Sequence, residues 1–183
     1  MDANTIFSNP EAVSREQENM LSVWHQHMHA EFVLKDADAA LATMTDHPYV
    51  FFVALGMARI GRVAVRELYA NTFLPNIPSD LEVNSLSLTV GADRIVEEMV
   101  ARFTHTIQMD WILPGVRPTN RRIEVAAAVV VGFEAGKIAY ERLYWDHAAV
   151  LSQAGVVDHP MAAAGIGAAG QLLKLAATPG AGA

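Results

Sequence analysis

A chain of 183 residues with 52% hydrophobic and only 18% charged residues has enough apolar surface to bury the core of one domain, which excludes a disordered protein. Its formal net charge of −7 and its lack of a long basic run argue against nucleic-acid or anionic-membrane partners, because both need clustered Lys and Arg. Cysteine is absent, which excludes disulfides, thiolate metal sites and a cysteine nucleophile.

The first thirteen residues carry neither a basic stretch nor an apolar stretch of the kind found in secretory signals. The longest apolar run, residues 125–131, is too short to cross a bilayer. We therefore expect a cytoplasmic protein with no membrane partner.

The N-terminal part of the chain predicts a helical hairpin. Ser14 and Gln17 have the spacing of a capping box, so residues 1–13 are expected to be a flexible arm and the first helix to run from there to about residue 35. Asp36 then begins a second, short helix. Apolar residues recur at helical spacing along the first helix: Leu21, Trp24, Met28 and Phe32.

The middle of the chain predicts one strand over residues 49–53, a third helix over residues 62–73, and then long strands joined by hairpins. The strand pairs are residues 81–90 with 94–109, and residues 122–133 with 137–145. Such long strands must twist and curl. The fold class we expect is α+β: a curved antiparallel sheet packed against three N-terminal helices, forming a cone with an apolar interior.

The domain is expected to span residues 14–158. Residues 159–183 are rich in Ala and Gly and predict a weak helix or a disordered tail.

The last predicted strand turns directly into a short helix at Asp146. Two readings of this residue are open. Its carboxylate can cap the helix by accepting from the amide of Ala148 or Ala149. Alternatively, it lies at the mouth of a cavity, near Tyr144, and serves as a general acid or base.

The sequence around this junction resembles a known family. Asp146 and the residues after it are similar to the signature D-x-x-x-L-L-x-Q-L-G that closes the SnoaL-like polyketide cyclases of the NTF2-like superfamily, although the Leu of Q-L-G is replaced here by Ala154. The resemblance in element order extends over residues 14–158 and implies the cone fold. It also implies that Asp146 is the general acid/base for an intramolecular aldol ring closure. The matching residues are Ala149, Val150, Leu151, Gln153 and Gly155.

His105 is the second candidate catalytic residue. Alternation along its strand places it on the same apolar face as Met99, Ala101 and Phe103, where it is either a proton carrier or a structural histidine. Tyr49 opens the first strand, and the superfamily resemblance implies that its hydroxyl can donate to a substrate carbonyl.

Three histidines at positions 25, 27 and 29 suggest a metal at first sight. On a helix His25 and His29 lie beside the buried stripe of Trp24, whereas His27 is expected to point elsewhere, so we predict no metal site. Trp24 and His29 are expected to border the pocket. Glu124 is a further candidate for substrate binding. Tyr144 is also a candidate, because alternation does not settle which face of residues 137–145 lines the cone.

Two functions remain open. One is an enzyme without a cofactor, which performs acid/base chemistry of the cyclase, isomerase or dehydratase type on a small apolar or aromatic carbonyl compound. The other is a non-catalytic module that binds a ligand or a protein. On either reading residues 125–131, which are apolar on both faces, predict a homodimer formed through the sheet.

Overall fold

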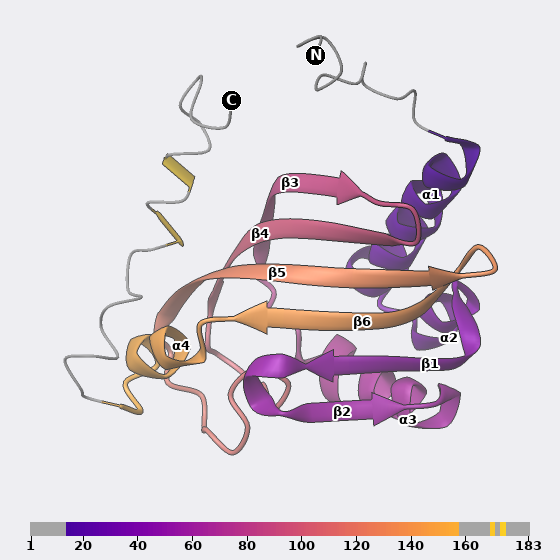
Figure 1. The fold of residues 1–183 in the computed structure, drawn as a ribbon. Coiled ribbons are helices and arrows are strands. Elements are labelled where there is room, and N and C mark those ends of the chain that lie inside the picture. Colours follow the sequence, from indigo (N-terminus) through magenta and orange to yellow (C-terminus); the bar gives the residue numbers. More distant parts are fainter. Residues whose placement is uncertain (1–13, 158–168, 171–172, 175–183) are drawn as a thin grey trace, which may run out of the picture.

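The computed structural model describes residues 14–157, 169–170 and 173–174 (Figure 1). The expectations for residues 1–13 and for most of residues 159–183 lie outside this part of the chain. Within it, no helix combines the length and the apolar character that a membrane span requires.

The first helix, α1 (Arg15–His29), begins where the capping box predicts. The Ser14 hydroxyl accepts from the Gln17 amide at 3.2 Å, and the Gln17 side chain accepts from the Ser14 amide at 2.8 Å. The helix continues as a π-helical turn, η1 (Ala30–Leu34), which ends at Lys35 in the left-handed conformation. Asp36 then caps α2 (Ala37–Ala42).

The predicted third helix is present, but only its first half is α-helical. It comprises α3 (Arg62–Glu67), the π-helical η3 (Leu68–Phe73) and the short 3-10 helix η4 (Leu74–Asn76). Both π-helical segments contribute residues to the interior described below, in keeping with the frequent occurrence of π-turns at functional sites.

Six strands form one curved sheet in the order β2-β1-β6-β5-β4-β3. All neighbours are antiparallel except β1 and β6, which are parallel. The last strand in the sequence is followed by α4 (His147–Gln153). The strands are β1 (Met44–Phe52), β2 (Met57–Ile60), β3 (Glu82–Val90), β4 (Arg94–Thr104), β5 (Arg122–Glu134) and β6 (Lys137–Trp145).

Three details differ from the expectation. Strand β1 begins at Met44 rather than at residue 49, and β4 ends at Thr104 rather than at residue 109. Strand β2 was not predicted, because it has only four residues and follows a 3-10 turn, η2 (Val53–Leu55), and the left-handed Gly56.

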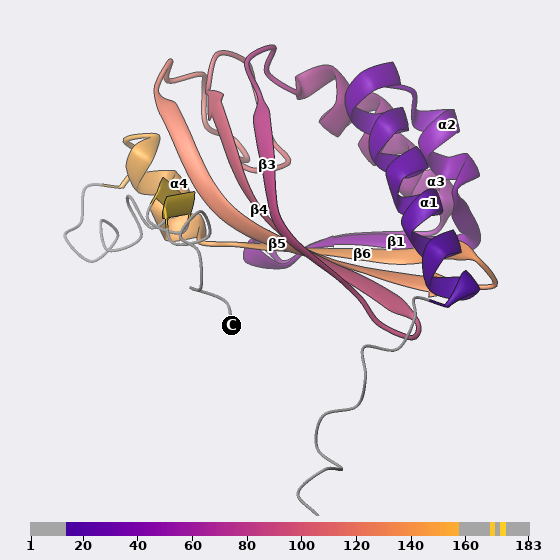
Figure 2. The same cartoon turned by 90° about the horizontal axis from the view of Figure 1, so that it is seen from above.

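The helices α1, α2 and α3 cover one face of the sheet, while the strands β3, β4 and β5 bend toward α4 at the other end (Figure 2). The main core lies between the helices and the sheet. A second cluster lies under the loop after β4 and against α4. Trp111 and Trp145 pack against both clusters, which makes one continuous apolar interior.

The outer face of the sheet carries an aromatic group built over a glycine. The ring of Tyr140 lies on Gly132, so close that a Cβ added to Gly132 would be 2.1 Å from the ring. Tyr140 stacks on Tyr49 with ring centroids 5.1 Å apart, and Arg142 lies over the Tyr140 ring and donates to the Tyr49 hydroxyl. Glycine at position 132 thus makes this arrangement sterically accessible.

We predict that Gly132→Ala lowers the free energy of unfolding by roughly 1–3 kcal/mol, because the added methyl must displace the Tyr140 ring. Urea unfolding measures the change. Gly91→Ala is the matched control, because its Cβ would meet its nearest neighbour at an ordinary 3.4 Å. Equal losses in the two variants would contradict the steric explanation.

Candidate active site

The buried face of the first helix carries polar residues. Met20, Trp24, His27 and Glu31 are all buried and follow one another at intervals of four, three and four residues. His25 and His29 are exposed. The prediction that His27 points away from the buried stripe was therefore wrong: the centre of the stripe runs through Met20 and His27 rather than through Leu21 and Met28.

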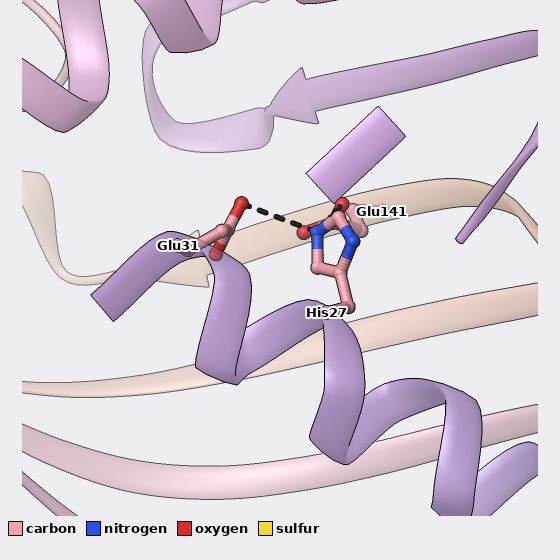
Figure 3. A group of neighbouring side chains, drawn as sticks. All are labelled: His27, Glu31 and Glu141. Carbon is pink, nitrogen blue, oxygen red and sulfur yellow. Dashed lines mark hydrogen bonds and ion pairs between the residues drawn. The ribbon is translucent and has the colours of Figure 1, made fainter. Parts of the chain in front are cut away.

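His27 contacts two carboxylates through the same ring nitrogen (Figure 3). Its Nε2 is 3.2 Å from Oε1 of Glu31, one helical turn further along, and 3.1 Å from Oε1 of Glu141 on β6. The Tyr69 hydroxyl, from η3, donates to the same Glu141 oxygen at 2.7 Å. Four residues from three parts of the chain thus form one buried polar cluster, which we call the His27 cluster: His27, Glu31, Tyr69 and Glu141.

The hydrogen bonds of the imidazole fix its protonation. The Thr43 hydroxyl donates to the Ala40 carbonyl at 2.7 Å, so its oxygen is left to accept from Nδ1 of His27, also at 2.7 Å. Nδ1 therefore carries a proton. Nε2 faces carboxylate oxygens, which accept and do not donate when ionised. The geometry favours an imidazolium with a proton on each nitrogen.

The pKa shifts agree with this reading. Burial alone would lower the pKa of His27, but Glu31 and Glu141 outweigh burial and raise it well above its ordinary value. Burial raises the pKa of Glu31, partly offset by His27. Burial, followed by the charges of Glu141 and Glu31, raises the pKa of Tyr69 well above its ordinary value.

The same ligand atoms could hold a small metal ion. One atom each from His27, Glu31 and Glu141 lie within 4.8 Å of one another, all buried. His27 and Tyr69 already supply hydrogen bonds to the carboxylates, so the cluster is satisfied without a metal. The absence of a metal stays a prediction.

The His27 cluster lies at one end of the apolar interior. Two adjoining cavities, of about 100 and about 60 Å³, occupy the cone. Glu31, Tyr69 and Glu141 line the smaller cavity, together with Trp24 and apolar side chains. All sixteen residues that line the larger cavity are apolar. Both cavities share six lining residues: Phe32, Phe52, Phe73, Met99, Val129 and Leu143.

A surface groove adjoins the larger cavity where η1 faces β3. Phe32, Leu81 and Val83 line both the groove and the cavity. His29 and Lys35 lie along the groove at the surface. This places the predicted residue His29 at the rim of the interior, outside the His27 cluster.

The structure separates the other predicted binding residues. Trp24 lines the smaller cavity and donates its indole N–H to Glu97 at 2.7 Å. Tyr49 belongs to the outer aromatic group, and Tyr144 is exposed on the same strand face as Tyr140. Glu124 forms an ion pair with Arg102. Of the five predicted binding residues, only Trp24 lines the interior. Tyr144 does not, because Glu141, Leu143 and Trp145 form the inward face of β6.

Asp146 is exposed and caps α4, with its Oδ1 accepting from the Ala149 amide at 3.0 Å. His105 is buried just beyond the end of β4, where its Nδ1 lies 3.2 Å from the Thr119 hydroxyl and its Nε2 has no partner among the described residues. Burial lowers the pKa of His105. Neither residue lines the two cavities, and no hydrogen bond within the described chain joins them. Their catalytic roles stay predictions.

Stability is expected to fall on the alkaline side because of the His27 cluster. The pKa of His27 is raised in the fold, so its contribution is complete below the unfolded value of about 6.5 and is lost as pH rises through the folded value. The raised pKa values of Glu31 and Tyr69 also make the folded state less stable as pH rises. Urea unfolding between about pH 6.5 and 9.5 measures this slope.

His27→Gln should destabilise the protein by roughly 3–5 kcal/mol at neutral pH, because the two buried carboxyl groups lose their cation. His25→Gln, on the exposed face of the same helix, is the control. A free energy of unfolding that increases from neutral to alkaline pH in the wild type would contradict the assignment.

Comparison with known proteins identifies relatives of this fold. A structure of a SnoaL-like protein from Jannaschia sp. CCS1 is 18% identical, with a TM-score of 0.64 over 83% of this chain and 100% of that one. An NTF2-like protein from Burkholderia pseudomallei K96243 is 16% identical, with a TM-score of 0.57 over 74% and 96% of the two chains. The epoxide hydrolase/cyclase-like enzyme SalBIII, which takes part in pyran ring formation in salinomycin, is 21% identical, with a TM-score of 0.53 over 72% and 92%.

These structural likenesses show the fold. A search among curated proteins found no match. The model of the SnoaL-like polyketide cyclase family matches residues 23–154, which include every element from within α1 to α4. Since this match covers well over half of the sequence, the chain belongs to the SnoaL-like polyketide cyclase family.

Proposed function

We propose that the protein is an enzyme that transfers protons on a small, largely apolar carbonyl compound bound in the cone. The observation that carries this proposal is the position of Glu31 and Glu141: both carboxyl groups line the smaller cavity and are bridged by one imidazole. Paired carboxyl groups in an apolar pocket are suited to acting as acid and base at neutral pH.

Glu141 is the base in this proposal, and Glu31 is the acid. Tyr69 and His27 both contact Oε1 of Glu141, which leaves Oε2 to accept a proton from the substrate. Glu31, whose pKa burial raises, donates its proton to the carbonyl oxygen. The carbon beside the carbonyl loses its proton to Glu141 as the oxygen gains one from Glu31, and a neutral enol forms.

Return of the two protons completes an isomerisation when the carbon that receives its proton differs from the one that lost it. Attack of the enol carbon on a second carbonyl of the same molecule gives a ring closure instead. The family membership and the cyclase-like description of SalBIII support this class of chemistry.

The test is hydrogen–deuterium exchange beside the carbonyl of cyclohexanone in D2O, followed by NMR. The wild type should accelerate exchange, and Glu141→Gln should reduce the acceleration roughly 100-fold or more, which is the usual contribution of a general base. Glu98→Gln, which removes an exposed carboxylate on β4, is the matched control. A Glu141→Gln protein that is folded and fully active would contradict the proposal.

The same assay tests the predicted roles of Asp146 and His105. If Asp146→Asn or His105→Gln abolishes exchange while Glu141→Gln does not, the acid/base centre lies at the α4 end of the cone. Thermal unfolding of each variant separates loss of chemistry from loss of the fold, since Asn caps a helix as well as Asp does and Asp146→Asn should leave the stability nearly unchanged.

A binding module is the second candidate function. It is favoured by the hydrogen bonds from His27 and Tyr69, which satisfy the carboxylates without a substrate. Saturable binding of cyclohexanone with no acceleration of exchange would support this reading over catalysis.

A homodimer through the outer face of the sheet is also part of the proposal. Tyr144 is 42% exposed on this face, and the outward side chains of β5, such as Ala126 and Val130, are half-buried in the single chain. Light scattering at micromolar concentration should report a dimer, and Val130→Glu should convert it to a monomer, because a charge would be placed in the contact. A wild-type monomer would count against it.

A further inference from the structure

The interior of the cone has polar groups at one end only. Glu31, Tyr69 and Glu141 line the smaller cavity, whereas all sixteen residues around the larger cavity are apolar. A ligand that fills both cavities therefore meets hydrogen-bonding side chains at a single point on its surface.

The tryptophans do not change this, although an indole N–H is a donor. Trp111 donates to the Asn76 carbonyl at 3.1 Å. Trp145 donates to Nδ1 of His147 at 3.4 Å, and Trp24 donates to Glu97. All three indole N–H groups of the chain are thus engaged by protein acceptors, and the walls of the larger cavity present aromatic faces and edges.

The aromatic walls and the volume fit one flat ring. Phe73 meets Trp111 edge-on, with centroids 5.1 Å apart and planes at 88°, and Phe32 meets Phe73 at 89°. The cavities of about 100 and 60 Å³ together resemble a dry protein cavity of about 150 Å³ that binds benzene. A multi-ring skeleton with several oxygen functions does not match the volume or the lining of these two cavities.

We infer that the substrate is a single-ring compound with one oxygen function, held at Glu31 and Glu141, and with hydrocarbon elsewhere. Such a compound has no second carbonyl, so of the two proposed reactions the inference selects isomerisation over ring closure. The placement of that oxygen rests on the proposed function, whereas the apolar remainder rests on the cavity walls alone. A second hydroxyl opposite the carbonyl would lose its hydrogen bonds to water and find no partner in the cavity, which weakens binding.

The test compares three ligands by their quenching of tryptophan fluorescence, since Trp111 and Trp145 line the larger cavity. Cyclohexanone should bind saturably. We expect 4-hydroxycyclohexanone to bind at least about tenfold more weakly. The two-ring ketone 2-decalone should also bind more weakly than cyclohexanone, despite its larger apolar surface.

Three results would overturn the inference: equal or tighter binding of 4-hydroxycyclohexanone, tighter binding of 2-decalone, or no saturable binding of cyclohexanone up to about 10 mM. None of them depends on catalysis. Ligand selectivity without deuterium exchange would leave this inference standing and remove the proposed function. Deuterium exchange without ligand selectivity would leave the proposed function standing and remove this inference.

A gain of binding gives a second test. Ala127, from β5, lines the larger cavity, and Ala127→Ser would add a hydroxyl there. In this variant we expect the ratio of the dissociation constants of 4-hydroxycyclohexanone and cyclohexanone to fall at least threefold, because the ligand hydroxyl gains a hydrogen-bond partner. Ala126→Ser, which adds a hydroxyl on the neighbouring residue outside the lining, is the matched control and should leave the difference unchanged. An unchanged difference in a folded Ala127→Ser protein would count against the apolar wall as the source of selectivity.

Discussion

The buried charge of His27 is the constraint on which the rest of the structure depends. Two carboxyl groups and a phenol lie in an apolar interior, and their burial without a cation would cost roughly 3–5 kcal/mol, a large share of the stability of one domain. The imidazole satisfies both carboxylates, and it is itself fixed by Thr43 and Ala40 from the next helix. The helical hairpin, the π-helical turns and strand β6 therefore have to meet in one arrangement.

Such a network specifies geometry more than it adds stability. A well-packed apolar cluster in the same place would fill the core without the free-energy cost of burying polar groups, and a half-satisfied buried polar network is destabilising. Its presence at the end of an otherwise apolar cavity is what distinguishes this interior from an ordinary core. We regard the combination of apolar walls and one polar end as the basis of both the ligand selectivity and the proton transfer that we propose.

Much of the fold followed from the sequence. The capping box at Ser14, the long strands and their glycine turns predicted an α+β cone, which the structure confirms. The site was harder to predict. Both Leu21–Met28 and Met20–His27 satisfy helical spacing with Trp24, and the apolar pair was chosen because polarity usually marks the solvent side. Alternation along β6 placed Glu141 with Leu143 and Trp145 but did not say which face was inside. That answer depends on contacts with Tyr69 and His27, which lie far away in the sequence.

The position of β6 has a consequence for how the chain folds. This strand is the last of the six in the sequence, yet it lies in the middle of the sheet, between β1 and β5. During synthesis the N-terminal helices and β1 emerge early and have no partner strand on that side until residues 137–145 leave the ribosome. His27 and Glu31 are made more than a hundred residues before Glu141, so folding is governed by non-local contacts and is expected to be slow. Until β6 inserts, the nascent chain exposes an apolar helix face and an open strand edge, both of which invite aggregation or chaperone binding.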